Sequence, residues 1–152
     1  ESIFATINQK VSKKEKPLVI ETASDDTEVV EEIIYTLDDH LKGKSEDVKI
    51  NFEALKERIF ALNVDNDVLE KPNKIYISYK HGKNFCEVRP QSKEIKIWLD
   101  IPFSDLDDPK KFSRDVSNVG HYGTGEVETK LGSLAELEDV MYLIEQSYNQ
   151  TL

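Results

Sequence analysis

A chain of 152 residues is long enough for one domain with a hydrophobic core and too short for two full enzymatic domains. Hydrophobic residues make up 38% of it and charged residues 33%, and no apolar run approaches the roughly 20 residues of a transmembrane helix, so we expect a soluble domain without membrane contacts. The net charge of −10 argues against long-range attraction to nucleic acid. Residues 71–96 are the exception, because they hold 7 Lys or Arg against 2 Asp or Glu.

The single cysteine, Cys86, cannot form a disulfide within the chain. A lone thiol at an inward strand position is typical of a small core residue in a reducing compartment, so we expect a cytoplasmic protein. The sequence begins at Glu1 without a methionine or a signal peptide, and we interpret it as a piece of a longer protein. The expected partner is then an upstream domain of the same protein, or another protein.

The first third of the chain predicts helices joined by polar segments. Apolar residues near the N-terminus fall at helical spacing and predict a short helix over 3–11, followed by a charged linker. Apolar residues then recur every three or four positions and predict an amphipathic helix over 27–42. A further helix is predicted over 52–62, with Asn51 as its N-cap.

The middle of the chain predicts an antiparallel sheet. Aliphatic residues alternate with charged or aromatic ones over 74–79, 84–89 and 94–100, and short turns join these three segments. The inward positions are Ile75, Ile77, Tyr79, Cys86, Val88, Ile95, Ile97 and Leu99. A fourth strand is predicted over 125–131, where the alternation returns after a glycine-rich loop.

Two more helices are predicted on either side of the fourth strand. Asp108 and Pro109 are typical of a helix start and predict a short helix over 109–114. A capping box at residues 133–136 begins a closing helix over 134–148, which has a clear apolar stripe.

Together these elements predict an α+β fold with two layers. The antiparallel four-stranded sheet carries the helices over 52–62 and 134–148 on its apolar face. We expect residues 1–50 to form an N-terminal linker and packing helix, and residues 51–152 to form the α+β domain.

Several short motifs, taken together, resemble an uncharacterised bacterial C-terminal domain. The motifs are KIYISYK at 74–80, NF at 84–85, LDDP at 106–109, RDVS at 114–117, GH at 120–121, GTGE at 123–126 and LEDVMYLI at 137–144. That domain of unknown function occurs in proteins labelled predicted transport proteins and beside restriction-type or endonuclease-like domains. The resemblance covers residues 51–150 and implies an accessory domain of a larger bacterial protein, in DNA processing or phage defence. It implies no activity.

The outward face of the predicted sheet combines basic and aromatic side chains. The candidate binding residues there are Lys74, Tyr76, Lys80, Lys83, Phe85, Arg89, Lys96 and Trp98. Such a surface suits nucleic acid, because bases stack on aromatic rings, at about 1–3 kcal/mol each, while cations bind the phosphates. The alternative is that a helix or a partner domain covers this face and that acidic residues of the fourth strand neutralise the lysines.

The glycine-rich loop over 115–125 is a second candidate site. Its candidate residues are Arg114, Asp115, His121 and Tyr122. They could form a pocket for an anion or nucleotide with loop N–H groups, or bring an imidazole and a carboxylate together as acid and base. In the structural alternative, His121 is hydrogen-bonded to Asp115 and only holds the shape of the loop.

No metal site and no cofactor are expected. Glu94 and Lys96 have the spacing of half a metal-dependent nuclease motif, but no Pro-Asp pair precedes them. The histidines and Cys86 lack the paired spacing of zinc ligands, and no phosphate-loop or dinucleotide fingerprint is present. We therefore predict a non-catalytic recognition or docking module, with nucleic acid as a candidate ligand. An enzyme or anionic-ligand site around His121 and a purely structural or oligomerisation domain are the alternatives.

Overall fold

The computed structural model describes residues 13–21, 27–63 and 65–152. The elements in chain order are β1 (Lys13–Glu21), β2 (Thr27–Tyr35), α2 (Leu37–Leu41), α3 (Glu46–Ala61), β3 (Leu69–Pro72), β4 (Ile77–His81), β5 (Lys83–Pro90), β6 (Ile95–Leu99), the 3-10 helix η1 (Phe103–Asp105), β7 (Arg114–Asp115), β8 (Val127–Leu131), the 3-10 helix η2 (Leu134–Glu136) and α4 (Leu137–Asn149). The short helix predicted over 3–11 lies outside the described residues.

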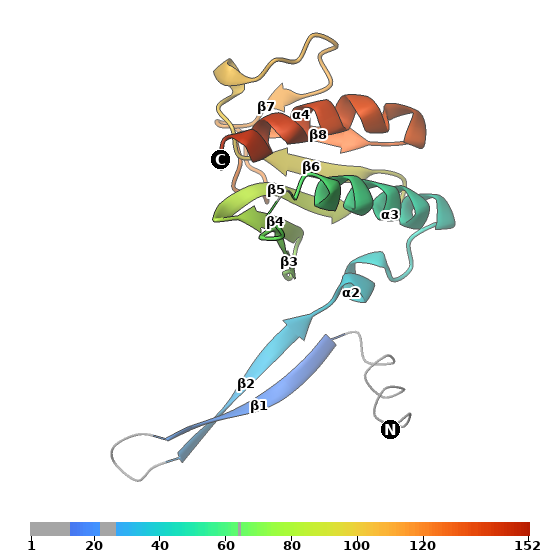
Figure 1. The fold of residues 1–152 in the computed structure, drawn as a ribbon. Helices are drawn as coiled ribbons and strands as arrows, with labels where there is room; N and C mark the ends of the chain where they lie inside the picture. Colours follow the sequence, from blue (N-terminus) through green and yellow to red (C-terminus); the bar gives the residue numbers. More distant parts are fainter. Residues whose placement is uncertain (1–12, 22–26, 64) are drawn as a thin grey trace.

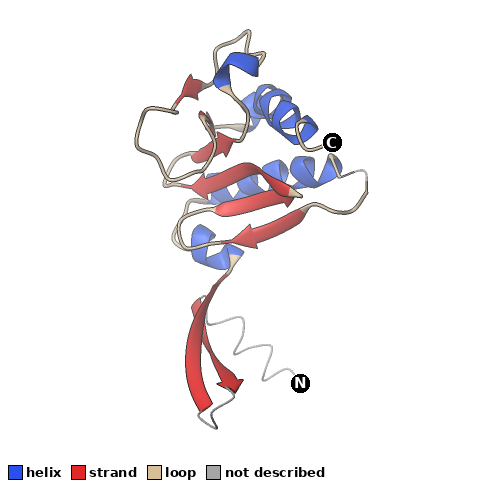
Figure 2. Ribbon diagram, turned by 90° about the vertical axis from the view of Figure 1, so that its left-hand side faces the viewer, coloured by secondary structure: helices blue, strands red, loops and turns tan. Residues whose placement is uncertain are grey.

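One antiparallel sheet forms the body of the domain, and α3 and α4 pack across one of its faces (Figure 1). The strand order is β3-β4-β5-β6-β8-β7. Figure 2 shows the strands in front of both helices, so the opposite face of the sheet is turned toward the viewer. The predicted α+β class and the antiparallel pairing are therefore confirmed.

The sheet contains six strands rather than the predicted four. The predicted strands correspond to β4, β5, β6 and β8, but β4 begins at Ile77 rather than at residue 74, so Lys74, Ile75 and Tyr76 precede the strand. The two additional strands, β3 and β7, are four and two residues long and pair at the edges. Segments of this length are too short to show a reliable alternation, so the sequence pattern did not reveal them.

Alternation in the central strands builds the hydrophobic core. The cross-strand neighbours Ile77, Val88 and Ile97 are fully buried. The helices contribute the facing layer, which contains Phe52, Leu55, Ile59, Val140, Ile144 and Tyr148. Burying one such aliphatic side chain contributes about 1.5–3 kcal/mol, so the core fixes the strand register and thereby decides which side chains reach the other face.

α3 and α4 confirm two of the predicted helices. α3 begins at Glu46 rather than at residue 52, because the Ser45 hydroxyl caps it by accepting a hydrogen bond from the Val48 N–H (3.2 Å). The helix predicted over 134–148 is present as η2 followed by α4. Within the described part of the chain, no helix combines the length and the apolar character needed to cross a membrane.

The helix predicted over 27–42 is wrong, because most of this segment is strand β2. β2 pairs with β1 along its whole length, and only residues 37–41 are helical. The segment is rich in β-branched residues, which favour a strand. Its pairs of adjacent apolar residues also fit the spacing of a helix, which is why the sequence pattern indicated one. The helix starts late because Thr36 and Asp39 form a capping box there. The β1–β2 hairpin projects from the body of the domain (Figure 1).

The helix predicted over 109–114 is also wrong, because this segment is a turn that leads into β7. The Asp108 carboxylate accepts hydrogen bonds from the N–H groups of Phe112 (3.0 Å) and Ser113 (2.9 Å). Lys111 adopts a φ of 57°, which a right-handed helix does not allow. Asp108 therefore stabilises a compact turn instead of capping a helix.

Candidate functional site

The face of the sheet opposite α3 and α4, called the open face below, carries three cations in a line. Arg89 of β5 lies directly opposite Lys96 of β6, and Lys96 lies directly opposite Lys130 of β8. Directly opposed residues on neighbouring strands, about 4.8 Å apart, point to the same side of a sheet. We call these three side chains the cationic row.

The positive charges of the row are only partly balanced. Lys130 forms an ion pair with Glu94 (Nζ to Oε1, 3.6 Å), and the Arg89 guanidinium lies over the Tyr122 ring, 4.6 Å from its centroid. Among the described residues, neither Arg89 nor Lys96 has an ion-pair partner. Like charges directly opposite each other destabilise a sheet, so the row is unfavourable unless an anion binds to it.

A groove of about 320 Å³ lies beside the row, next to β8. Its charged lining residues are Lys96, Lys111, Arg114, Lys130, Glu94 and Glu128. Arg114 donates from Nε to Oε1 of Glu128 (2.7 Å), which is nearly buried. The four cations outnumber the two carboxylates, so the groove is a local positive region on an acidic protein.

Phe85, predicted to point outward, is buried in the core instead. The strand register shifts between Tyr79 and Lys80, and this irregularity turns the Phe85 ring toward α4. The ring packs edge-on against Tyr148, with 5.3 Å between centroids. The Phe85 carbonyl accepts a hydrogen bond from the Ser147 hydroxyl (2.6 Å), so the distortion is held by α4.

Trp98 does point to the open face, yet only 1% of it is exposed. The glycine-rich loop lies over its indole, so close that a Cβ atom at Gly123 would be 2.5 Å from the ring. The indole Nε1 donates to Oε2 of Glu128 (3.1 Å), and Tyr76, half-buried, packs edge-on against the ring. The loop thus removes the largest predicted stacking surface and leaves Tyr122, 58% exposed, beside Arg89.

A buried carboxylate fastens the loop to the sheet. Glu87 is 2% exposed and lies on the open face, directly opposite Trp98. It accepts hydrogen bonds from the Thr124 N–H (2.7 Å), the Thr124 hydroxyl (2.6 Å) and the Asn84 side-chain amide (2.9 Å). A buried carboxylate needs such donors, so the two sites predicted separately, sheet face and loop, form one surface.

The acid–base pair considered for the loop is not formed. His121 places both ring nitrogens on backbone carbonyls, Nδ1 on Val119 (2.7 Å) and Nε2 on Gly125 (2.8 Å). Asp115 instead accepts from the N–H (2.9 Å) and hydroxyl (2.7 Å) of Ser117, and these hydrogen bonds lower the pKa of its carboxyl. The hydrogen bond between His121 and Asp115 expected in the structural alternative is therefore wrong, and His121 instead contacts two backbone carbonyls of its own loop.

The remaining predicted cations divide between the two ends of the open face. Lys74 lines a second groove together with Arg89, and so extends the row. Lys80 pairs with Asn84, five residues before Arg89 on β5, which corresponds to about 16 Å of strand. Lys83 lies beside it and forms an ion pair with Asp100 (3.8 Å). Sequence reasoning missed Lys130, because only the pairing of β8 with β6 brings it opposite Lys96, which lies 34 positions earlier in the chain.

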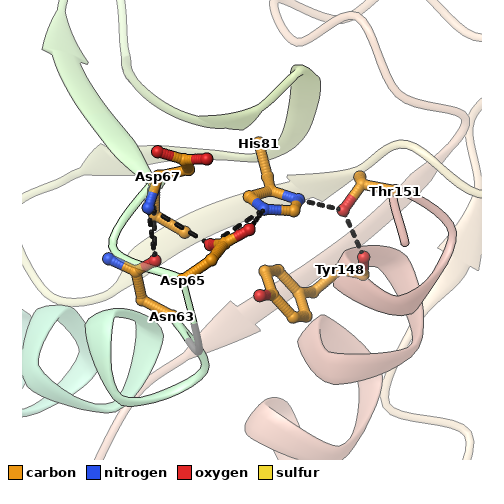
Figure 3. Close-up of polar contacts among 7 residues, drawn as sticks. Asn63, Asp65, Asp67, His81, Tyr148 and Thr151 are labelled. Atoms are coloured by element: carbon orange, nitrogen blue, oxygen red, sulfur yellow. Dashed lines mark hydrogen bonds and ion pairs between the residues drawn. The ribbon is translucent and has the colours of Figure 1, made fainter.

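A polar cluster at the far end of the β4–β5 hairpin has the residue types of a nucleophilic triad (Figure 3). His81 lies between the Asp65 carboxylate (Nε2 to Oδ2, 3.0 Å) and the Thr151 hydroxyl (Nδ1 to Oγ1, 2.8 Å), and its hydrogen bond lowers the pKa of Asp65. Thr151 donates its single hydroxyl proton to the Tyr148 carbonyl (2.6 Å), so it cannot pass that proton to His81. We call this cluster the clasp, because it joins the loop after α3, the hairpin and the end of α4.

Comparisons with known proteins identify relatives but no activity. A family described as a domain of unknown function, DUF5655, matches residues 37–151. An uncharacterized protein of Haemophilus influenzae is 35% identical over 142 residues, which cover 93% of this chain. The chain spans 46% of the length of that relative. No solved structure matches. Among the described residues, no group of three or more His, Cys, Asp or Glu side chains could hold a metal ion.

Proposed function

We propose that this chain, which belongs to the DUF5655 family of unknown function, is a non-catalytic module. Its cationic row would bind the phosphate backbone of a nucleic acid. The module would serve as an accessory domain of a larger cytoplasmic protein in DNA processing or phage defence. The greater length of the Haemophilus relative supports a multidomain context. The resemblance to domains found beside endonuclease-like regions supports the nucleic-acid context.

The observation that carries this proposal is the register of Arg89, Lys96 and Lys130. Three directly opposed cations repel one another in the free protein, and the phosphates of a nucleic acid would remove that repulsion. The row spans two inter-strand gaps, about 10 Å, which suits a few consecutive phosphates. Tyr122 beside Arg89 would offer one stacking surface for a base.

A row of three cations supports modest, salt-dependent affinity. Each phosphate neutralised on a single strand contributes about −0.7 to the slope of log K against log salt, so we expect a slope of about −2. Affinity in the micromolar range at low salt is consistent with a contribution of this size. Binding by this module would then position nucleic acid for the remainder of the larger protein.

Fluorescence anisotropy with a labelled ten-nucleotide single strand tests the proposal at low salt. Lys96→Glu breaks the row and should weaken binding on the order of tenfold, with a shallower salt slope. Lys80→Glu is the matched control, because it makes the same charge change on the same open face outside the row. Absence of binding at micromolar protein, or equal loss in both variants, would overturn the proposal. Circular dichroism of both variants confirms that they fold.

A further inference from the structure

A groove of about 560 Å³ continues the cationic row at the end where Arg89 lies. Its polar lining residues are Asp39, His40, Lys44, Lys74, Arg89, Gln91 and Ser92. The volume lies within the range of small-molecule sites, about 300–1,000 Å³. Arg89 belongs to the row and to this groove, so a strand bound to the row would enter the groove with its next nucleotide.

His40, at the end of α2, gives this groove a neutral hydrogen-bonding group. It is 8% exposed, and its Nε2 lies 2.6 Å from the Asn73 carbonyl. A carbonyl only accepts, so Nε2 must carry the proton and donate. Burial lowers the pKa of His40 and outweighs the hydrogen bond to Asn73 and the charge of Asp39, which raise it, so the pKa lies below its usual value and the neutral ring predominates at pH 7.

The other ring nitrogen of His40 is then an acceptor that reaches solvent. Nδ1 of a neutral imidazole protonated at Nε2 carries a lone pair, and no group of the described residues donates to it. The Tyr148 hydroxyl is the one fully buried side-chain nitrogen or oxygen in the described part of the chain without a partner. Nδ1 is therefore not fully buried, and His40 lines the groove.

From this arrangement we infer that the groove binds a phosphate together with a neighbouring hydroxyl, and that the strand held by the row is RNA rather than DNA. Lys44, Lys74 and Arg89 would bind the phosphate, and the ribose 2′-hydroxyl would donate to Nδ1 of His40. The 2′-hydroxyl is the group by which proteins distinguish RNA from DNA at a single site. This inference rests on the proposed function of the row.

Among the described residues, Asp39 is the one carboxylate that lines the groove, and its negative charge does not prevent the groove from binding a phosphate. Its Oδ2 accepts a hydrogen bond from the Thr36 N–H (2.8 Å) in the capping box of α2, so that oxygen is already used. Three cations against one engaged carboxylate leave the groove positive. A positive groove that also offers one neutral hydrogen-bond acceptor suits a ligand in which a phosphate lies beside a hydroxyl donor.

Fluorescence anisotropy with three labelled oligoadenylates of ten nucleotides tests whether the sugar is recognised. The three strands contain ribose, deoxyribose and 2′-O-methyl ribose. The base is the same in all three, so only the sugar differs. One hydrogen bond predicts two- to tenfold tighter binding of the ribose strand. The 2′-O-methyl strand keeps the oxygen but has no donor, so it should bind like the deoxyribose strand.

The variant His40→Gln should abolish the preference, so that the ribose and deoxyribose strands bind with equal affinity. Glutamine keeps an N–H for the Asn73 carbonyl but has no acceptor at the Nδ1 position. His81→Gln is the matched control, because it changes the same residue type in the clasp, and it should keep the preference. Equal binding of the three strands, or a preference that survives His40→Gln, overturns the inference and leaves the row standing. Binding of none of them overturns both.

Discussion

At one end of the sheet three cations on the open face lie directly opposite one another, and at the other end of the sheet charged side chains lie beside groups of opposite charge. Among the described residues, the three cations of the row end form one ion pair, between Lys130 and Glu94. At the clasp end Lys83 pairs with Asp100, and His81 lies between a carboxylate and a hydroxyl. Both ends belong to the same strands and the same core.

This difference indicates that the clasp end of the sheet serves stability and that the row end serves binding. Charges at the clasp end are arranged to satisfy one another, which is what a structural region requires. Charges at the row end are arranged to leave attraction for a group that the chain does not supply. Variants at the clasp should therefore change the unfolding free energy more than the affinity, and variants in the row should do the reverse.

The largest expected effect comes from the glycine loop, which lies over Trp98 between the two ends. A Cβ atom at Gly125 would be 2.0 Å from the Leu99 carbonyl oxygen, so Gly125→Ala must displace the β6 backbone or the loop. We expect a loss of about 3 kcal/mol in the free energy of unfolding, at the upper end of overpacking effects. Trp98 is the only tryptophan and lies beneath the loop, so its fluorescence reports the change during urea unfolding.

Gly120→Ala is the matched control for the loop, because no atom lies within 4 Å of a Cβ atom built there. It should change the free energy of unfolding by no more than about 1 kcal/mol and can stabilise the protein by restricting the unfolded chain. A loop that tolerates both changes equally would show that it does not lie on β6.

The clasp supplies the second prediction. His81→Ala removes the hydrogen bond to Thr151 and the ring contact with Tyr148, whose centroid lies 5.1 Å away. The expected cost is about 2 kcal/mol, from lost packing and one hydrogen bond. Hydrogen exchange should become faster at the end of α4, while the affinity for a single strand stays within twofold of the wild type. A parallel fall in stability and affinity would show that the two ends are not separate.

The sequence predicted the central sheet but only part of the site, for physical reasons that particular residues illustrate. Ile77 and Ile97 alternate with polar or aromatic neighbours, so local pattern alone placed them inward, and the structure confirms it. Phe85 follows the same pattern but sits where the strand register shifts, and its position depends on α4. Local alternation contains no information about such a distant contact.

Trp98 and Lys130 illustrate the second limit of sequence reasoning. The outward direction of Trp98 was right, but its burial depends on a loop more than 20 residues later in the chain. Lys130 joins the row only because β8 pairs with β6, and that pairing is set by the core rather than by the local sequence. Long-range packing thus decided which predicted residues form the site.

The smallest expected effect is the sharpest test of the row, because its sign is unusual. Lys96→Met removes the central charge and keeps the length of the side chain, so repulsion from Arg89 and Lys130 disappears. We expect the free energy of unfolding to rise by about 0.2–1 kcal/mol at low salt while strand affinity falls. In 1 M salt the Debye length is about 3 Å, so the gain in stability should vanish. Lys80→Met, on the same face but opposite Leu69 and Asn84, should show no such gain. A destabilised Lys96→Met would mean that the three cations do not repel one another, and the argument that an anion must relieve them would fail.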